Sequence, residues 1–294
     1  MFAWRKLASA KWEDAWVERL AFLGPTRVVI TALPNRRSLR IEAFGLTKKE
    51  AQAVVQQFGG DMKPMKSIAL PPPAPRKPLV IRDRLLIVDP QTPLPPAAAA
   101  RSVITIPAAM AFGTGEHATT ASCLRLLCDL ARIHEKAGAP WDFLDLGTGS
   151  GILAIAARRL GASHAEGCDF DPHAVRTAKE NVAANRAEPL PIHRRDVLKW
   201  TPKRTWEVVA ANLFSEVLIA AAPTLAAAVR PGGHLLLSGI LRTQEAEVVA
   251  TFTARGFVFL KTVRKGKWVT LLAVLPQKDR PDAQNTLTRP VRRR

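Results

Sequence analysis

The stretch Leu144-Asp145-Leu146-Gly147-Thr148-Gly149-Ser150-Gly151-Ile152-Leu153 decides the fold of this chain. In it an apolar strand pattern runs into three glycines at alternate positions, and an apolar helical pattern follows. Glycine permits tight turns and lets a ligand approach the bare backbone, while the first N–H groups of a helix point into the space so formed. The stretch therefore predicts a pocket for a nucleotide-like cofactor, and a cofactor-using enzyme is the first hypothesis.

The spacing of these glycines indicates the kind of cofactor. A dinucleotide-binding loop has the pattern G-x-G-x-x-G with an acid about 20 residues later, but this chain has G-x-G-x-G. The tighter spacing resembles motif I of the seven-strand S-adenosylmethionine methyltransferases. A second predicted strand ends at Asp169, where a carboxylate can accept hydrogen bonds from both ribose hydroxyls.

Two alternatives need no ligand. The glycines then form a plain strand-to-helix turn, and Asp169 serves as a helix N-cap. Asp171 is the better N-cap candidate, because Pro172 would then occupy the first helical position.

Strand and helix patterns alternate through the second half of the chain. The expected strands are 142–146, 165–169, 192–195, 207–211, 233–237, 258–263 and 268–274, and the expected helices are 151–160, 173–185, 216–230 and 244–255. This alternation predicts an α/β fold with a parallel sheet covered on both faces, and Gly266 predicts a closing hairpin with one antiparallel strand. Ligands of such sheets bind beyond the carboxyl ends of the strands, where the loop at Gly147, Asp169 and Asn212 should converge.

The rest of the chain predicts four regions. Residues 1–68 read as a small ferredoxin-like α+β domain, in which a short strand near 67–70 completes the sheet. Residues 69–103 contain the run Pro71-Pro72-Pro73-Ala74-Pro75 and read as a Pro-rich linker and connecting region. Residues 104–275 form the seven-strand Rossmann-like domain, and residues 276–294 read as a basic, disordered tail.

Composition restricts the partners and the compartment. A net charge of +18 over 294 residues favours a polyanionic neighbourhood such as nucleic acid or the ribosome, although an arginine-rich genome explains it equally well. The three cysteines form no C-x-x-C pair and predict neither a disulfide framework nor a zinc site. The first residues lack the apolar core of a signal peptide, so we expect a cytoplasmic protein without a membrane span.

A longer set of motifs carries a resemblance to a known family. The string 111–120, A-F-G-T-G-E-H-A-T-T, precedes the glycine-rich stretch, and D-F-D-P at 169–172, A-N-L at 211–213 and L-S-G-I-L at 237–241 follow it. Together they closely resemble the PrmA family, which methylates the eleventh protein of the large ribosomal subunit. The resemblance covers about residues 104–274, and the N-terminal unit matches only in size and order of elements.

The resemblance implies S-adenosylmethionine as cofactor and a ribosomal protein as substrate, held by the N-terminal domain. By motif position it implies cofactor contacts from Thr120, Gly147, Gly149, Asp169 and Asn212. Thr120 lies near the start of a predicted helix, where an N-cap role is the alternative. By analogy with the wider class Asp196 accepts from the adenine amino group, and a solvent-facing loop acid is its alternative.

Asn212 is the residue we expect to carry the chemistry. It follows an apolar strand at the place where amine and amide methyltransferases put the polar residue of an [N/D]-P-P-[Y/F]-type motif. Its carbonyl groups can hold an amine N–H so that the lone pair points at the methyl donor. His117 is read as structural, because no metal partner or nucleophile accompanies it. Two departures from the family concern substrate fit: no proline follows Asn212, and a glycine before Phe112 is missing.

The sequence thus predicts a protein N-methyltransferase acting on lysine and N-terminal amines of that ribosomal protein, with weak contact to ribosomal RNA through its basic surface. Two alternatives remain. One is methylation of ribosomal RNA or of another translation protein. The other is a noncatalytic ribosome-associated binding protein, against which the intact glycines, Asp169 and Asn212 argue.

Overall fold

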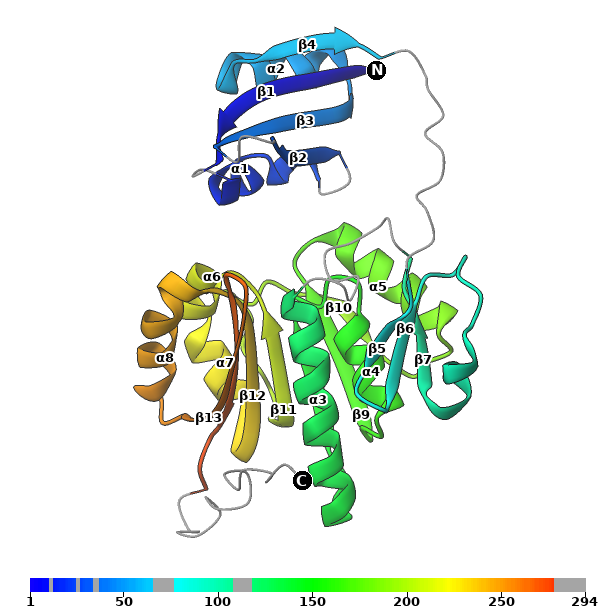
Figure 1. Ribbon diagram of the computed structural model, residues 1–294. Coiled ribbons are helices and arrows are strands. Elements are labelled where there is room, and N and C mark those ends of the chain that lie inside the picture. The colour runs from blue at the N-terminus through cyan, green and yellow to red at the C-terminus, as the bar shows by residue number, and fades with distance from the viewer. Residues whose placement is uncertain (11–12, 25–26, 34–36, 66–76, 108–117, 278–294) are drawn as a thin grey trace. The chain divides into compact units, whose positions relative to one another are not determined.

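The computed structural model describes residues 1–10, 13–24, 27–33, 37–65, 77–107 and 118–277 of the chain. The described elements form two compact units, one running from β1 to β4 and one from β5 to β14 (Figure 1). Each unit is built around its own buried apolar side chains. Among the described helices, none combines the length and the apolar character that crossing a membrane requires.

The first unit has the strand order of a ferredoxin-like sheet. Its sheet runs β2-β3-β1-β4 and all neighbouring strands are antiparallel. Trp4, Leu39 and Ile41 are fully buried between this sheet and the helices. The elements are β1 (Phe2–Ser9), α1 (Glu13–Arg19), η2 (Ala21–Leu23), β2 (Val28–Ala32), β3 (Ser38–Leu46), α2 (Lys48–Phe58) and β4 (Asp61–Pro64).

The fourth strand of this unit lies earlier than the sequence predicted. It spans Asp61–Pro64, and the expected strand at 67–70 lies outside the described residues. Gly59 and Gly60 both have positive φ angles, so the chain reverses at once after α2. A side chain at Gly60 would meet Arg5 O at 2.5 Å, which shows how closely β4 is brought against β1.

The second unit contains the predicted seven-stranded sheet. Its order is β10-β9-β8-β11-β12-β14-β13, with all pairs parallel except β12–β14 and β13–β14. The hairpin expected at Gly266 is therefore confirmed. The strands are β8 (Asp142–Leu146), β9 (His164–Asp169), β10 (Ile192–Arg194), β11 (Trp206–Asn212), β12 (Val229–Leu241), β13 (Val258–Lys265) and β14 (Trp268–Val274).

Helices cover both faces of this sheet, as Figure 1 shows. Alternate residues of β11 enter different cores: Val208 and Ala210 pack with the helices α3, α4 and α5, whereas Val209 and Ala211 pack with α6, α7 and α8. Two-sided burial explains why the strand sequences are continuously apolar. The helices are α3 (Ala118–Ala137), α4 (Ile152–Arg159), α5 (Pro172–Ala184), α6 (Ser215–Ala220), α7 (Ala222–Ala228) and α8 (Glu245–Thr253), with η4 (Arg242–Gln244) before α8.

The sequence analysis missed a small sheet in the region that it treated as a connection. The strands β5 (Leu79–Ile81), β6 (Leu85–Val88) and β7 (Ser102–Thr105) form a three-stranded sheet, with η3 (Pro96–Ala100) between the last two. Ile81, Leu85 and Ile104 are fully buried in the same core as α3. The strands are only three or four residues long, and so short a run gives little periodicity to recognise.

One predicted helix is two helices. The expected helix 216–230 is divided into α6 and α7, which meet at Ala221. Pro223 lies in the first turn of α7, where its missing N–H has no intrahelical partner to lose. Pro223 therefore suits the start of a new helix. The strand β12 also starts earlier than predicted, at Val229.

Two half-buried histidines predict acid sensitivity of the second unit. His134 stacks on Trp141 with ring centroids 5.4 Å apart, and His234 meets His134 edge-on at 6.4 Å. Burial lowers the pKa of His234 from 6.5 to about 4, and it also lowers the pKa of His134. Both rings are therefore neutral in the folded protein at pH 7, and unfolding lets them take up protons below pH 6.5.

The contribution of these neutral rings to the free energy of unfolding is fully present above pH 6.5 and is lost as the pH falls toward 4. Between pH 7 and pH 5 we expect His234 to account for a loss of about 2 kcal/mol in the free energy of unfolding. Urea unfolding at both pH values measures it, with His234→Phe as the comparison. An equal loss in both proteins would show that His234 is not responsible.

Candidate functional site

The glycine-rich loop lies between β8 and α4, as predicted. Gly147, Gly149 and Gly151 all have positive φ angles, which explains why glycine recurs at these positions. The N–H groups of Gly147 and Thr148 both donate to Cys168 O at 2.9 Å, so the loop is fastened to the end of β9. Gly151 is the N-cap residue of α4 and has no side chain with which to cap the helix.

Asp169 lies beside this loop at the carboxyl end of β9. Its Oδ2 accepts from Gly149 N and its Oδ1 accepts from Asp171 N, each at 3.0 Å. Burial raises the pKa of Asp169 above its usual 3.8. A carboxylate offers about four acceptor positions, so two remain for ribose hydroxyls. Asp171 is the N-cap of α5, with its Oδ1 accepting from His173 N at 2.8 Å, so the helix-capping role belongs to Asp171.

Asn212 is the last residue of β11, the strand that neighbours β8. Its Nδ2 donates to Thr119 Oγ1 at 3.4 Å. Its Oδ1 is buried and has no hydrogen-bond partner among the described residues. Because a buried acceptor without a partner costs free energy, this atom is an open acceptor that a ligand can satisfy.

Two further hydroxyls near Asn212 share this property. Thr120 is 1% exposed, and its Oγ1 finds no partner within the described part of the chain. It is the third residue of α3, so it is not the N-cap of that helix. Ser215, three residues after Asn212, is also 1% exposed and its Oγ is equally without a described partner.

Leu213 fills the space between the glycine loop and β12. A Cβ added at Gly147 would lie 2.3 Å from Leu213 Cδ2, and a Cβ at Gly239 would lie 2.4 Å from Leu213 O. Leu213 N also donates to Ser238 O at 3.0 Å. Gly147 therefore leaves room for the Leu213 side chain, and Gly239 lets the Leu213 backbone lie close to β12. These contacts fix the backbone directly after Asn212.

This close approach predicts a sensitive position at Gly239. Gly239→Ala combines a left-handed backbone (φ 82°) with a clash against the Leu213 carbonyl, and we expect the free energy of unfolding to fall by about 3 kcal/mol. Gly161 is the matched control, because it has φ 96° but nothing within 4 Å of its added Cβ. Gly161→Ala should cost about 1 kcal/mol. Urea unfolding of both variants measures the difference, and equal losses would exclude the clash as the cause.

The structure thus brings together four of the five predicted site residues around one edge of the sheet: Gly147, Gly149, Asp169 and Asn212. Thr120 joins them through α3, whose neighbouring Thr119 bonds Asn212. His117 and the motif residues 111–117 lie outside the described residues. Asp196 follows β10, and its side chain is 40% exposed with Oδ1 accepting from Leu198 N at 3.0 Å.

Sequence reasoning missed three contributors. Thr119 orients the amide of Asn212, Ser215 offers a buried hydroxyl, and Leu213 meets both glycines. The two adjacent threonines at 119–120 and the serine after the strand were visible signals, but their burial was not. Among the described residues, no group of three or more His, Cys, Asp or Glu side chains is arranged to hold a metal ion.

Comparisons with known proteins agree on one family. A family model described as "Ribosomal protein L11 methyltransferase (PrmA)" matches residues 75–275. A protein named ribosomal protein L11 methyltransferase from Chloroflexus aurantiacus is 41% identical over 199 residues, covering 60% of this chain and 59% of that protein. Its namesake from Geobacter sulfurreducens is 46% identical over 170 residues, covering 58% and 54%. The chain therefore spans little more than half the length of these curated relatives.

A solved structure supports the same grouping. The crystal structure of a ribosomal protein L11 methylase from Lactobacillus delbrueckii subsp. bulgaricus superposes with a TM-score of 0.60 at 26% sequence identity. The match covers 69% of this chain and all of that one.

Proposed function

Because the chain belongs to the ribosomal protein L11 methyltransferase (PrmA) family, we propose that it is an S-adenosylmethionine-dependent methyltransferase of that ribosomal protein. The seven-stranded sheet, with its antiparallel strand β14 inserted between β12 and β13, supports the methyltransferase fold. The family match lies within the second unit, so the proposal rests mainly on that unit.

The observation that carries this proposal is the buried Oδ1 of Asn212, which has no hydrogen-bond partner in the described part of the chain. Since Nδ2 donates to Thr119, the amide is oriented with its oxygen free to accept an N–H. An acceptor amine that donates an N–H to this oxygen keeps its lone pair free, and the lone pair can then point in line at the methyl group of the donor. When bound, S-adenosylmethionine supplies an activated methyl group and its own leaving group, so the protein needs chiefly to align a neutral nucleophile.

The residues around the loop fit that cofactor. Asp169 has acceptor positions left for the ribose hydroxyls, and the left-handed glycines at 147, 149 and 151 leave bare backbone at alternate positions of the loop. The buried hydroxyl of Thr120, for which the described residues offer no partner, supplies one more polar contact on the α3 side. We assign cofactor binding to Thr120, Gly147, Gly149, Asp169 and Asn212, and the orientation of the acceptor amine to Asn212.

We further propose that the accepted amines are lysine side chains and the N-terminal α-amine. The nucleophile must be neutral, and a free lysine has a pKa near 10.4 whereas an α-amine has one of about 7.7 to 8. An apolar cleft lowers both values by penalising the charged form. Leu213 and Phe214 follow Asn212 directly and supply apolar side chains for such a cleft. Phe214 is 51% exposed, so its ring is accessible to an incoming substrate.

Recognition of the ribosomal protein is assigned to the first unit. Leu7 is 62% and Val29 is 46% exposed, although both lie in strands of its sheet. Val29 pairs with Glu42, whereas its neighbour Ile30 pairs with the buried Ile41, so Val29 lies on the face away from the core. Exposed apolar side chains on an open sheet face suit protein recognition.

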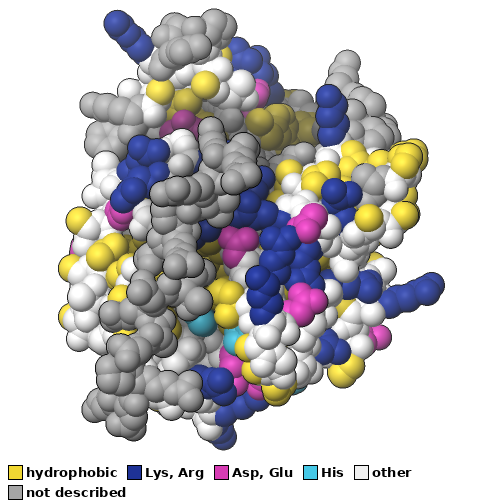
Figure 2. All heavy atoms as spheres, turned by 60° about the horizontal axis from the view of Figure 1, so that its bottom comes forward, with side chains coloured by type: hydrophobic (Ala, Val, Ile, Leu, Met, Phe, Trp, Pro, Cys, Tyr) yellow, Lys and Arg dark blue, Asp and Glu magenta, His cyan; other side chains and the backbone are white. Residues whose placement is uncertain are grey.

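Ribosomal RNA is the second candidate substrate, and the net charge of +18 is the observation that favours it. Figure 2 shows Lys and Arg side chains beside Asp and Glu side chains on one face of the molecule. Several cations are indeed paired: Arg82 with Asp129, Arg84 with Glu135 and Arg132 with Asp83. Pairing lowers the charge available to phosphates, so we rank RNA as a weak contact and not as the substrate.

The three cysteines are free, which suits the reducing cytoplasm in which we place the reaction.

Mass spectrometry tests the proposal. Purified protein is incubated with S-adenosylmethionine and either the organism's own L11 protein or its ribosomal RNA, beside an Asn212→Ala control. We expect methyl groups on lysine or the N-terminal amine of the protein substrate and none in the control. Transfer to RNA would support the second candidate. Binding of the cofactor without transfer to either would favour the noncatalytic alternative.

A further inference from the structure

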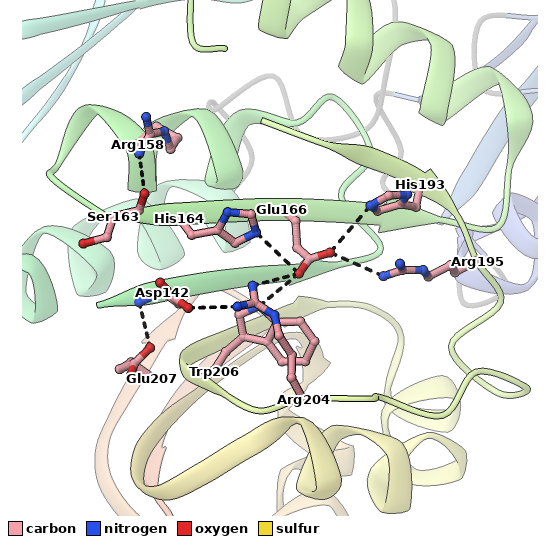
Figure 3. Close-up of polar contacts among 10 residues, drawn as sticks. All are labelled: Asp142, Arg158, Ser163, His164, Glu166, His193, Arg195, Arg204, Trp206 and Glu207. Carbon is pink, nitrogen blue, oxygen red and sulfur yellow. Dashed lines mark hydrogen bonds and ion pairs between the residues drawn. The ribbon is translucent and has the colours of Figure 1, made fainter. Parts of the chain in front are cut away.

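A buried carboxylate in β9 lies apart from the site described above. Glu166 is in the middle of this strand, and its side chain is only 9% exposed. Removing a carboxylate from water is costly unless several partners satisfy it. Figure 3 shows that side chains from three stretches of the chain converge on it.

Two arginines and an indole provide the closest contacts. Glu166 Oε1 accepts from Arg204 Nη2 and from Trp206 Nε1, both at 3.1 Å. Glu166 Oε2 accepts from Arg195 Nη1 at 3.5 Å. Arg204 is held from its other side as well, because its Nη1 donates to Asp142 Oδ2 at 3.0 Å.

Two imidazoles complete the cluster. His164 Nε2 lies 3.7 Å from Glu166 Oε1, and His193 Nε2 lies 3.6 Å from Glu166 Oε2. They come from β9 itself and from β10, so the carboxylate is approached along its own strand and from the neighbouring one.

The arginines belong to the two ends of one connection. Residues 195–205 join β10 to β11; Arg195 is the first of these residues and Arg204 the last but one. Each guanidinium also lies over an indole, Arg195 over Trp200 at 4.9 Å and Arg204 over Trp206 at 4.6 Å. One carboxylate therefore fastens both ends of a connection that has no regular secondary structure of its own.

This connection runs beside the proposed cofactor site. Arg195 N donates to Asp169 O at 2.9 Å, so the connection starts against the residue assigned to the ribose. The next residue is Asp196, whose backbone oxygen accepts from Lys199 N and Trp200 N in a tight turn. Where Asp196 lies thus depends on how firmly Arg195 is held.

We propose that Glu166 is a positioning residue for adenine recognition: it fixes the 195–205 connection so that Asp196 accepts from the adenine amino group. The inference rests on the proposed function, because it presumes that an adenosine cofactor binds beside Asp169. Glu166 touches neither cofactor nor substrate, and it acts through Arg195 and Arg204.

Calorimetry with two ligands tests this role. S-adenosylhomocysteine carries the adenine amino group, whereas S-inosylhomocysteine has an oxo group in its place. The wild-type protein should prefer the first by about tenfold, the value of one hydrogen bond to a charged group. In Glu166→Gln this preference should fall to less than about twofold, while kcat at saturating cofactor stays within about twofold of wild type.

Glu207→Gln is the matched control. Glu207 lies in β11 with its side chain 14% exposed, pairs with Arg230 and accepts from Asp142 N, but it holds neither end of the connection. This variant should keep the wild-type preference. If Glu166→Gln fails to fold, Arg195→Gln, which removes a half-buried partner, should show the same loss of preference.

The outcomes separate the two ideas. Wild type that binds neither ligand would contradict the proposed function itself. Wild type that binds both equally, or a Glu166→Gln protein that keeps the preference while losing affinity for both ligands, would overturn the positioning role and leave the methyltransferase proposal standing.

Discussion

Replacing Asn212 with alanine is expected to lower kcat for methyl transfer by about 100-fold or more, with the protein still folded. The variant removes the buried Oδ1 that has no described partner and is assigned to hold the acceptor amine. Because alanine cannot align the lone pair, the effect should fall on kcat far more than on the binding of the cofactor, whose dissociation constant should rise by less than about tenfold. Single-turnover kinetics and calorimetry measure the two quantities separately.

Thr119→Val is the companion variant. It keeps the shape of the threonine but removes the hydroxyl that accepts from Asn212 Nδ2 at 3.4 Å. The amide then loses its orientation but not its oxygen, and we expect a smaller fall in kcat, about tenfold. A wild-type kcat in Asn212→Ala would show that the acceptor amine is not held by this side chain.

Asp169→Ala is expected to weaken cofactor binding by about 100-fold or more. The variant loses the acceptors assigned to both ribose hydroxyls, and each hydrogen bond to a charged group is worth about 1.5–3 kcal/mol. It also frees the N–H of Gly149, which now donates to Asp169 Oδ2 at 3.0 Å. Calorimetric titration with S-adenosylhomocysteine measures the affinity.

Asp171→Ala makes the same change of charge two residues away. Asp171 caps α5 through His173 N, so its loss should lower the free energy of unfolding by about 1 kcal/mol and leave the affinity nearly unchanged. Equal losses of affinity in the two variants would mean that general charge near the loop, and not a specific contact from Asp169, attracts the ligand.

Local sequence patterns predicted the second unit closely because each of its elements is strongly patterned. The strand at 142–146 has the predicted bounds, and the hairpin at Gly266 and the capping Asp171 are confirmed. Weaker patterns failed. The strands β5 to β7 are too short to show a period, and the chain reversal at Gly59 and Gly60 moved the fourth strand of the first unit.

The sequence by itself determined the glycine loop, the acid after the next strand and the asparagine after β11, because turns and buried strands impose residue types within a few positions. Only the tertiary structure decided which side chains meet. Thr119 orients Asn212 from 93 residues away, and Glu166 meets Arg204 across 38 residues. The parallel crossovers place β11 beside β8 and the 195–205 connection beside β9. Strand order depends on how separate apolar faces pack together, whereas local conformation depends on neighbouring residues.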